Sequence, residues 1–166
     1  GRLALDDLAF ALLGNPTPPP GQTKDPRLAS ITVAHLLRHE GGWDRDASGD
    51  PMFKSRLISQ ALGIAGPATA QDTLYYMLGQ PLDFDPGTNY AYSNFGYSVL
   101  GRVIEQVTGQ SYEEYVRSAV LAPMGITRME LGRTKREDRP DDEVRYHLYE
   151  GARDVVSVFP QDTERV

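Results

Sequence analysis

The chain has 166 residues, which is enough for one domain with a buried core and too few for two comfortable ones. Its composition, 40% hydrophobic and 24% charged, is ordinary for a soluble globular protein, and its net charge of −6 argues against nucleic-acid binding, which needs a clustered basic face. The absence of cysteine excludes disulfides and cysteine-bound metals, and no apolar run approaches the roughly 18 residues of a membrane span.

The N-terminal part is predicted to hold one short helix and one long loop. Within residues 1–14, Asp6 and Asp7 precede an apolar run that stops at Gly14, a pattern typical of a short helix. Residues 15–30 contain five prolines, which permit only polyproline or turn conformations. We therefore expect an extended surface loop between the first helix and the rest of the chain.

Residues 31–131 are predicted to form a helical unit. Thr32 and Thr69 are the expected N-caps of two of its helices, and glycines follow each helix. The first three helices are expected over residues 33–39, 53–62 and 70–78.

The clearest helical pattern follows a predicted type II turn at Asp85-Pro86-Gly87-Thr88. Phe95, Val99, Val103 and Val107 recur every four residues and give a broad apolar face, which predicts a helix that ends at Gly109.

A further helix is predicted directly after it. Ser111 and Glu114 have the spacing of a capping box, and Pro123 prevents a helix from continuing past Leu121. Residues 132–166 are charged and predicted to form a loop, with short strands at Val144–Tyr149 and Val155–Phe159 as a hairpin. The predicted fold class is therefore mostly α.

The tripeptide Tyr92-Ser93-Asn94 stands between the Pro-Gly turn and the clearest helix. The stretch from Phe84 to Tyr97 closely resembles the second signature region of class C β-lactamases, DD-peptidases and related esterases, in which Tyr-x-Asn has this setting. Three more segments resemble the family in the same order: Ile31–His39, Gly101–Tyr112 and Leu121–Thr127. The chain is thus similar to an internal portion of the serine β-lactamase and penicillin-binding-protein superfamily.

This resemblance implies a helical subdomain of a β-lactamase or transpeptidase-like α+β fold. It implies acyl-enzyme chemistry on an amide, lactam or ester, as in β-lactamases, DD-carboxypeptidases and esterases, with a small-molecule or peptide substrate. Tyr92 matches the family's catalytic tyrosine, and Asn94 matches the residue whose amide holds the substrate; Ser93 matches a variable position. Family members of this kind suggest a bacterial periplasmic or secreted location.

The nucleophile that the family requires does not occur in the chain. None of the nine serines has a lysine three residues later, and the only lysines are Lys24, Lys54 and Lys135. The family's Lys/His-x-Gly motif has one formal match, His39-Glu40-Gly41, at the end of a predicted helix. We expect a fragment of a longer hydrolase whose isolated chain is inactive; the alternative is a non-catalytic binding or scaffold protein that retains the fold.

Other assignments stay open at this stage. Tyr92 can pack in a core, Asn94 can be the N-cap of the helix that follows, and Trp43 either walls the substrate cleft or anchors its loop. A subdomain without its sheet leaves apolar helix faces uncovered, and self-association through these faces is one outcome that follows.

His35 and His39 have a spacing that can bind zinc. Leu36 stands where metalloproteases have glutamate, however, and packing is the more usual role of such a pair. We expect no metal and no cofactor.

Overall fold

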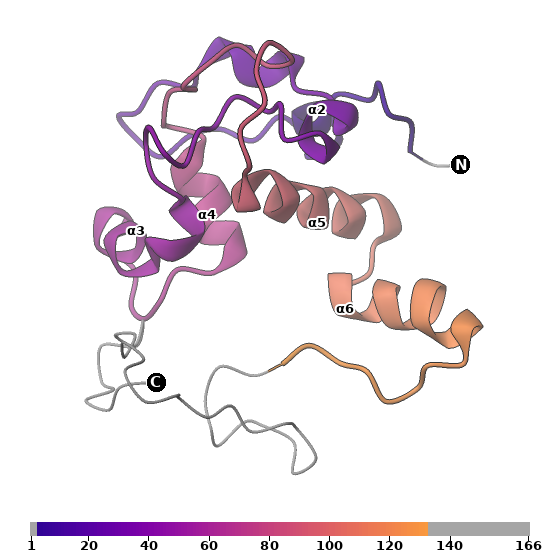
Figure 1. The fold of residues 1–166 in the computed structure, drawn as a ribbon. Helices are drawn as coiled ribbons and strands as arrows, with labels where there is room; N and C mark the ends of the chain where they lie inside the picture. Colours follow the sequence, from indigo (N-terminus) through magenta and orange to yellow (C-terminus); the bar gives the residue numbers. More distant parts are fainter. Residues whose placement is uncertain (1–2, 133–166) are drawn as a thin grey trace, which may run out of the picture.

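The computed structural model describes residues 3–132, and this part of the chain is helical without a regular strand. The prediction of a mostly α chain is therefore confirmed for these residues, whereas the predicted hairpin at 144–159 lies outside them. Figure 1 shows the arrangement. The elements are α1 (Ala9–Leu12), η1 (Pro26–Ser30), α2 (Val33–Leu37), η2 (Pro51–Phe53), α3 (Ser55–Leu62), α4 (Ala70–Met77), α5 (Asn94–Thr108), α6 (Tyr112–Tyr115), η3 (Val116–Leu121) and η4 (Ala122–Met124).

Helix α5 is the central element, and α1, α2, α4 and α6 all contact it. Its predicted apolar face is confirmed, because Phe95, Val99 and Val103 are at most 1% exposed and Val107 packs against the same core. Gly109 ends the helix in the left-handed conformation, at φ 72°, as expected. In Figure 1, α5 crosses the middle of the molecule, with α2 on one side and α6 beyond its C-terminal end.

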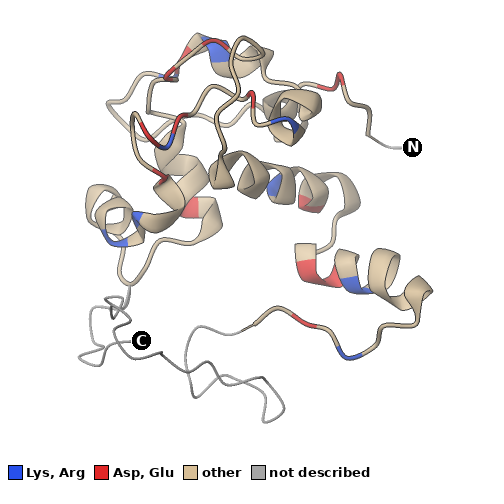
Figure 2. Ribbon diagram, in the orientation of Figure 1, with Lys and Arg blue, Asp and Glu red and all other residues tan. Residues whose placement is uncertain are grey.

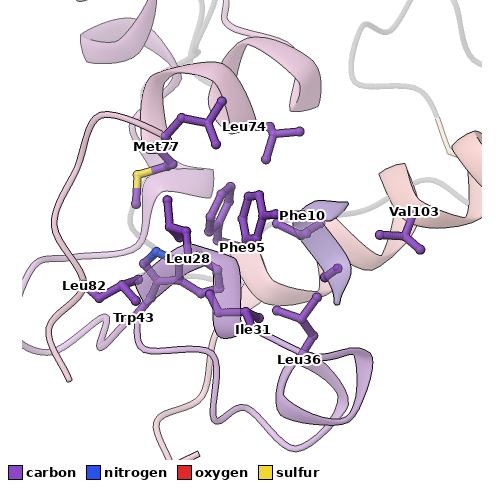
Figure 3. Close-up of a cluster of buried hydrophobic side chains, with 13 residues drawn as sticks. Phe10, Leu28, Ile31, Leu36, Trp43, Leu74, Met77, Leu82, Phe95 and Val103 are labelled. Carbon is purple, nitrogen blue, oxygen red and sulfur yellow. The ribbon is translucent and has the colours of Figure 1, made fainter. Parts of the chain in front are cut away.

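The core gathers apolar side chains from α1, η1, α2, α4 and α5. Figure 3 shows Phe10 and Phe95 at its centre, with Leu28, Ile31 and Leu36 beside them. Leu28 belongs to η1, so the last five residues of the predicted 15–30 loop form a turn of helix that reaches the core. Asp25 starts this turn by accepting the N–H of Arg27, and Pro26 supplies a fixed φ at its first position.

Three of the helices begin with a capping box, and the predicted turn before the tripeptide is present. Thr32, Thr69 and Ser111 each form a capping box with the side chain three residues on. The turn at residues 85–88 also forms as predicted, with Gly87 at φ 78° and the Thr88 N–H donating to Asp85 O at 3.1 Å.

Several helix boundaries differ from prediction. The helix expected from residue 53 begins at Ser55, because Phe53 ends the separate turn η2. Helix α2 stops at Leu37, because His39 adopts a left-handed backbone at φ 59°. The helix expected through Leu121 is regular only over α6; it continues as the wider turn η3 and the tighter turn η4, which contains Pro123.

The surface of the described residues gives no sign of a single basic face. Figure 2 shows acidic and basic residues spread over helices and loops. Within residues 3–132, none of the helices is both long and apolar enough to cross a membrane.

Candidate active site

The Tyr92-Ser93-Asn94 tripeptide lies at the junction between the loop after α4 and the first turn of α5. Ser93, not Asn94, is the N-cap: its hydroxyl accepts the N–H of Gly96 at 3.0 Å, and only 6% of the residue is exposed. The alternative of Asn94 as cap is therefore wrong, and Ser93 has a structural role that its variable position did not suggest. Asn94, as the first helical residue, keeps its carboxamide available for other contacts.

A chain of three polar side chains joins the tripeptide to the loop of residues 44–50. The Tyr92 hydroxyl donates to Oδ1 of Asn94 at 3.0 Å, and Nδ2 of Asn94 donates to Oδ2 of Asp50 at 2.7 Å. Tyr92 is 44% exposed, so its hydroxyl is open to an incoming molecule. The two residues predicted to act together are thus in direct contact.

The His39 side chain contacts the tripeptide through its ring and through a hydrogen bond. Its ring lies 4.7 Å from the ring of Tyr92 and 4.9 Å from that of Tyr97, nearly parallel to the second, and it meets Tyr90 edge-on. Its Nδ1 accepts the N–H of Ser93 at 3.2 Å. A neutral imidazole that accepts at Nδ1 carries its proton on Nε2, so this contact also selects the tautomer.

Backbone hydrogen bonds tie the loop before the tripeptide to the segment after α2. The N–H groups of Asp83, Gly87 and Ala91 donate to the carbonyls of Gly42, Glu40 and His39, at 2.8, 2.9 and 3.0 Å. The two segments therefore run alongside each other in opposite directions. This pairing brings residues 39–42, far from Tyr92 in sequence, to the site.

A positive charge lies against the exposed tyrosine. The Arg45 guanidinium carbon is 5.0 Å from the centroid of the Tyr92 ring, a cation–π distance, and half of the Arg45 side chain is exposed. The loop of residues 44–50 thus contributes a cation at one end and the Asp50 carboxylate at the other.

Trp43 lies in the core rather than on a surface. It is 4% exposed and meets Phe95 edge-on at 4.8 Å, and its indole N–H has no acceptor among residues 3–132. Such a buried ring has little area to offer a substrate, which agrees with the alternative of a loop anchor.

The two histidines that were expected on one helix make different contacts. Nδ1 of His35 completes the capping box with Thr32, whereas His39 faces the tyrosines. Within residues 3–132, no three histidine, cysteine or acidic side chains gather in a way that could hold a metal ion.

An ion-pair cluster fixes the other end of the loop that leads to the tripeptide. Arg27 donates to both oxygens of Asp25, to Asp85 at 2.8 Å and to the carbonyl of Leu82 at 2.8 Å. The Leu82 N–H donates to Asp25 in return. Hydrogen bonds from the Arg27 side chain lower the pKa of Asp25 from 3.8 to about 2, against the opposing effect of burial.

Sequence reasoning found Tyr92 and Asn94 and missed Asp50, Arg45 and the aromatic role of His39. Asp50 did have a local signal, since Asp-Pro before an apolar residue is a typical N-cap, and it caps η2 as Asp25 caps η1. Its contact with Asn94 joins residues 44 positions apart and has no local signal.

The Beta-lactamase family model matches residues 1–164 of the chain. A protein of Escherichia coli O157:H7, with the provisional name D-alanyl-D-alanine carboxypeptidase, is 28% identical over 163 residues, which are 96% of this chain and 35% of that protein. The chain thus spans about a third of the length of such curated relatives.

Solved structures agree with this match. The octameric penicillin-binding protein homologue from Pyrococcus abyssi is 28% identical, with a TM-score of 0.53 over 75% of this chain and 26% of that one. A D-stereospecific amidohydrolase from Streptomyces is 27% identical, with a TM-score of 0.54 over 75% of this chain and 36% of that one.

Proposed function

We propose that this chain, which belongs to the β-lactamase family, forms the helical subdomain of a serine hydrolase that acts through an acyl-enzyme on an amide, lactam or ester. The observation that supports this most is the pairing of an exposed Tyr92 hydroxyl with the Asn94 carboxamide at the start of a buried helix. Both groups lie at the junction of a loop with α5, where the packed helix helps to hold them in place.

We propose further that the nucleophile comes from outside these 166 residues. No Ser-x-x-Lys sequence occurs in the chain, and relatives that match nearly all of it are almost three times as long. An acyl-enzyme needs an activated serine, so the missing serine and lysine would come from the parts of the protein beyond this chain.

In this proposal Tyr92 transfers a proton between the serine and the leaving group, and Asn94 holds a polar group of the substrate. A phenolate accepts a proton and the phenol so formed can give that proton up again, and a primary amide can donate and accept hydrogen bonds at once. Exposure of Tyr92 lets its hydroxyl meet a serine brought from elsewhere in the protein.

The test is Tyr92→Phe in the full-length protein. We expect acylation by a nitrophenyl ester or a penicillin to slow by about 10²- to 10⁴-fold, the usual contribution of general acid–base catalysis, when measured as the pre-steady-state burst. Tyr97→Phe is the matched control, because the Tyr97 ring also stacks on His39 but its hydroxyl donates to the carbonyl of Leu37. An acylation rate that Tyr92→Phe leaves unchanged would remove Tyr92 from the mechanism.

A second candidate is a binding or scaffold protein that kept the fold without the reaction, and the absence of Ser-x-x-Lys from the chain favours it. The sequence of the full-length gene separates the two candidates. A Ser-x-x-Lys motif elsewhere in that gene supports the hydrolase, and its absence supports the scaffold.

A further inference from the structure

We infer that Asp50 is a positioning residue, which fixes the orientation of the Asn94 carboxamide and so directs the proton of the Tyr92 hydroxyl. The chemical consequence of this inference rests on the proposed function of Tyr92 and Asn94. The orientation itself rests only on contacts within the described residues.

The Asp50 carboxylate is itself held by the backbone. One oxygen, Oδ1, accepts the N–H of Met52 at 3.0 Å and caps η2, whose first residue, Pro51, is buried. The second oxygen, Oδ2, accepts Nδ2 of Asn94 at 2.7 Å. Because the first contact fixes the carboxylate, the second oxygen is presented to Asn94 in a defined place.

The chemistry of a carboxylate then fixes the carboxamide. An ionised carboxylate can only accept hydrogen bonds, so the NH₂ group of Asn94 must face Asp50. The carbonyl oxygen of Asn94 must therefore face the Tyr92 hydroxyl, which lies 3.0 Å away. Since that oxygen can only accept, the hydroxyl must donate to it.

This arrangement leaves two groups free for the reaction. In the phenol form, the Tyr92 oxygen donates its proton to Asn94 and keeps its lone pairs to accept a hydrogen bond from a donor such as a serine hydroxyl; it takes the serine proton only once its own proton has left. Nδ2 of Asn94 carries a second N–H, for which residues 3–132 provide no hydrogen-bond acceptor, and this N–H can meet a substrate carbonyl. If the carboxamide were reversed, the Tyr92 oxygen would accept a hydrogen bond from the NH₂ group of Asn94. Asn94 would then present an acceptor, not a donor, to the substrate.

A capping role alone would not require the second contact. Asp44, in the same loop, accepts the N–H of the residue two positions on at 2.9 Å, as Asp50 does, yet Asp44 does not contact Asn94. Asp44 is therefore the matched control for the loss of a local cap.

The experiment uses four single variants of the full-length protein and one double variant, Asp50→Asn with Asn94→Ala. Asp50→Asn keeps an oxygen for the Met52 N–H but turns an NH₂ group toward Asn94, which favours the reversed carboxamide. Asp50→Ser keeps a good N-cap and is too short to reach Asn94. Asp44→Asn is the control, and Asn94→Ala removes the group through which Asp50 is inferred to act.

We expect Asp50→Asn and Asp50→Ser to slow acylation by about 10- to 100-fold, the scale of a small misplacement at a reacting centre, and Asp44→Asn to have no such effect. In the Asn94→Ala background, Asp50→Asn should slow acylation no further. Full additivity of the two changes, or an unchanged rate in both Asp50 variants, would overturn the inference.

A spectroscopic measurement separates this inference from the proposed function. In protein labelled with ¹⁵N-asparagine, the side-chain NH₂ signal of Asn94, assigned by its loss in Asn94→Ala, should move in Asp50→Asn and Asp50→Ser but not in Asp44→Asn. If the Asn94 NH₂ signal does not move in the two Asp50 variants, the positioning role is wrong, even if Tyr92→Phe slows acylation. If the Asn94 signal moves but Tyr92→Phe and Asn94→Ala are acylated at the wild-type rate, the positioning role is supported. The proposed mechanism of Tyr92 and Asn94 is then wrong.

Discussion

At the residue scale, Gly41 is packed closely against the core beside the site, where the chain turns from α2 into the loop that contains Trp43. A Cβ atom on Gly41 would lie 2.7 Å from the Trp43 ring and 3.2 Å from Leu36. Both neighbours belong to the core. The absence of a side chain at Gly41 therefore allows the Trp43 ring to pack directly under the segment that positions His39.

This packing predicts opposite effects for two glycine substitutions. Gly41→Ala should lower the free energy of unfolding by about 1–3 kcal/mol, the usual cost of overpacking a core. Gly101→Ala should raise it by about 0.5–1 kcal/mol, because Gly101 lies within α5 and its Cβ would have only an ordinary contact, 3.9 Å from Tyr112. Urea denaturation of the chain measures both; equal effects of the two changes would contradict this packing.

At the element scale, the Asp25–Arg27 cluster joins η1 to the segment that leads to the site. The Asp25 carboxyl group has a side-chain exposure of only 9%, while Arg27 is 36% exposed. Asp25 therefore both caps its own helical turn and anchors Leu82, more than 50 residues further along the chain.

The lowered pKa of Asp25 predicts how stability depends on pH. Because the folded pKa, about 2, lies below the unfolded value of 3.8, the contribution is fully present above about pH 4 and is lost as the pH falls toward 2. We expect Asp25→Asn to lower the free energy of unfolding at neutral pH by about 1–2 kcal/mol, a value reduced for screening through the partly exposed Arg27.

Denaturant titrations at about pH 7 and pH 3 check this expectation. The difference in the free energy of unfolding between the wild-type chain and Asp25→Asn should be smaller at the lower pH. A gap that is the same at both pH values would show that the ionised pair does not stabilise the fold.

Sequence patterns were sufficient where an element is determined locally. The N-caps Thr32 and Thr69 and the capping box at Ser111 were all predicted, because each involves groups only three residues apart. The end of α2 was not, because the left-handed backbone of His39 accompanies contacts with Ser93 and three tyrosines that are distant in sequence. For the same reason, Asp50 could be predicted as a cap but not as a partner of Asn94.

At the scale of the whole molecule, the described residues bring together a tyrosine, an amide and a carboxylate. This set can orient a proton and a polar substrate group, and in the proposed function it acts on a serine supplied from elsewhere. A resemblance built on four short segments identified the superfamily, which the family match over residues 1–164 confirms. It could not supply the contacts between the segments, which depend on folding.

The proposed division of labour predicts the behaviour of the 166-residue chain by itself. It should form no covalent adduct with a penicillin or a fluorophosphonate probe, because none of its serines has the lysine that the family uses for activation. Intact mass after prolonged incubation is the measurement, with the full-length protein as the positive control. Stoichiometric labelling of the short chain would reveal a nucleophile within it.

The backbone pairing of residues 39–42 with residues 83–91 also has a consequence for dynamics. Its four backbone hydrogen bonds, together with the Ser93 N–H bond to His39, connect both segments to the start of α5. A fluctuation that separated the backbone around Tyr92 from the segment after α2 would have to break these bonds together, so the region should open as one cooperative unit rather than as a fraying loop. Although the Tyr92 side chain is exposed to solvent, its backbone should therefore move only when this hydrogen-bonded unit opens.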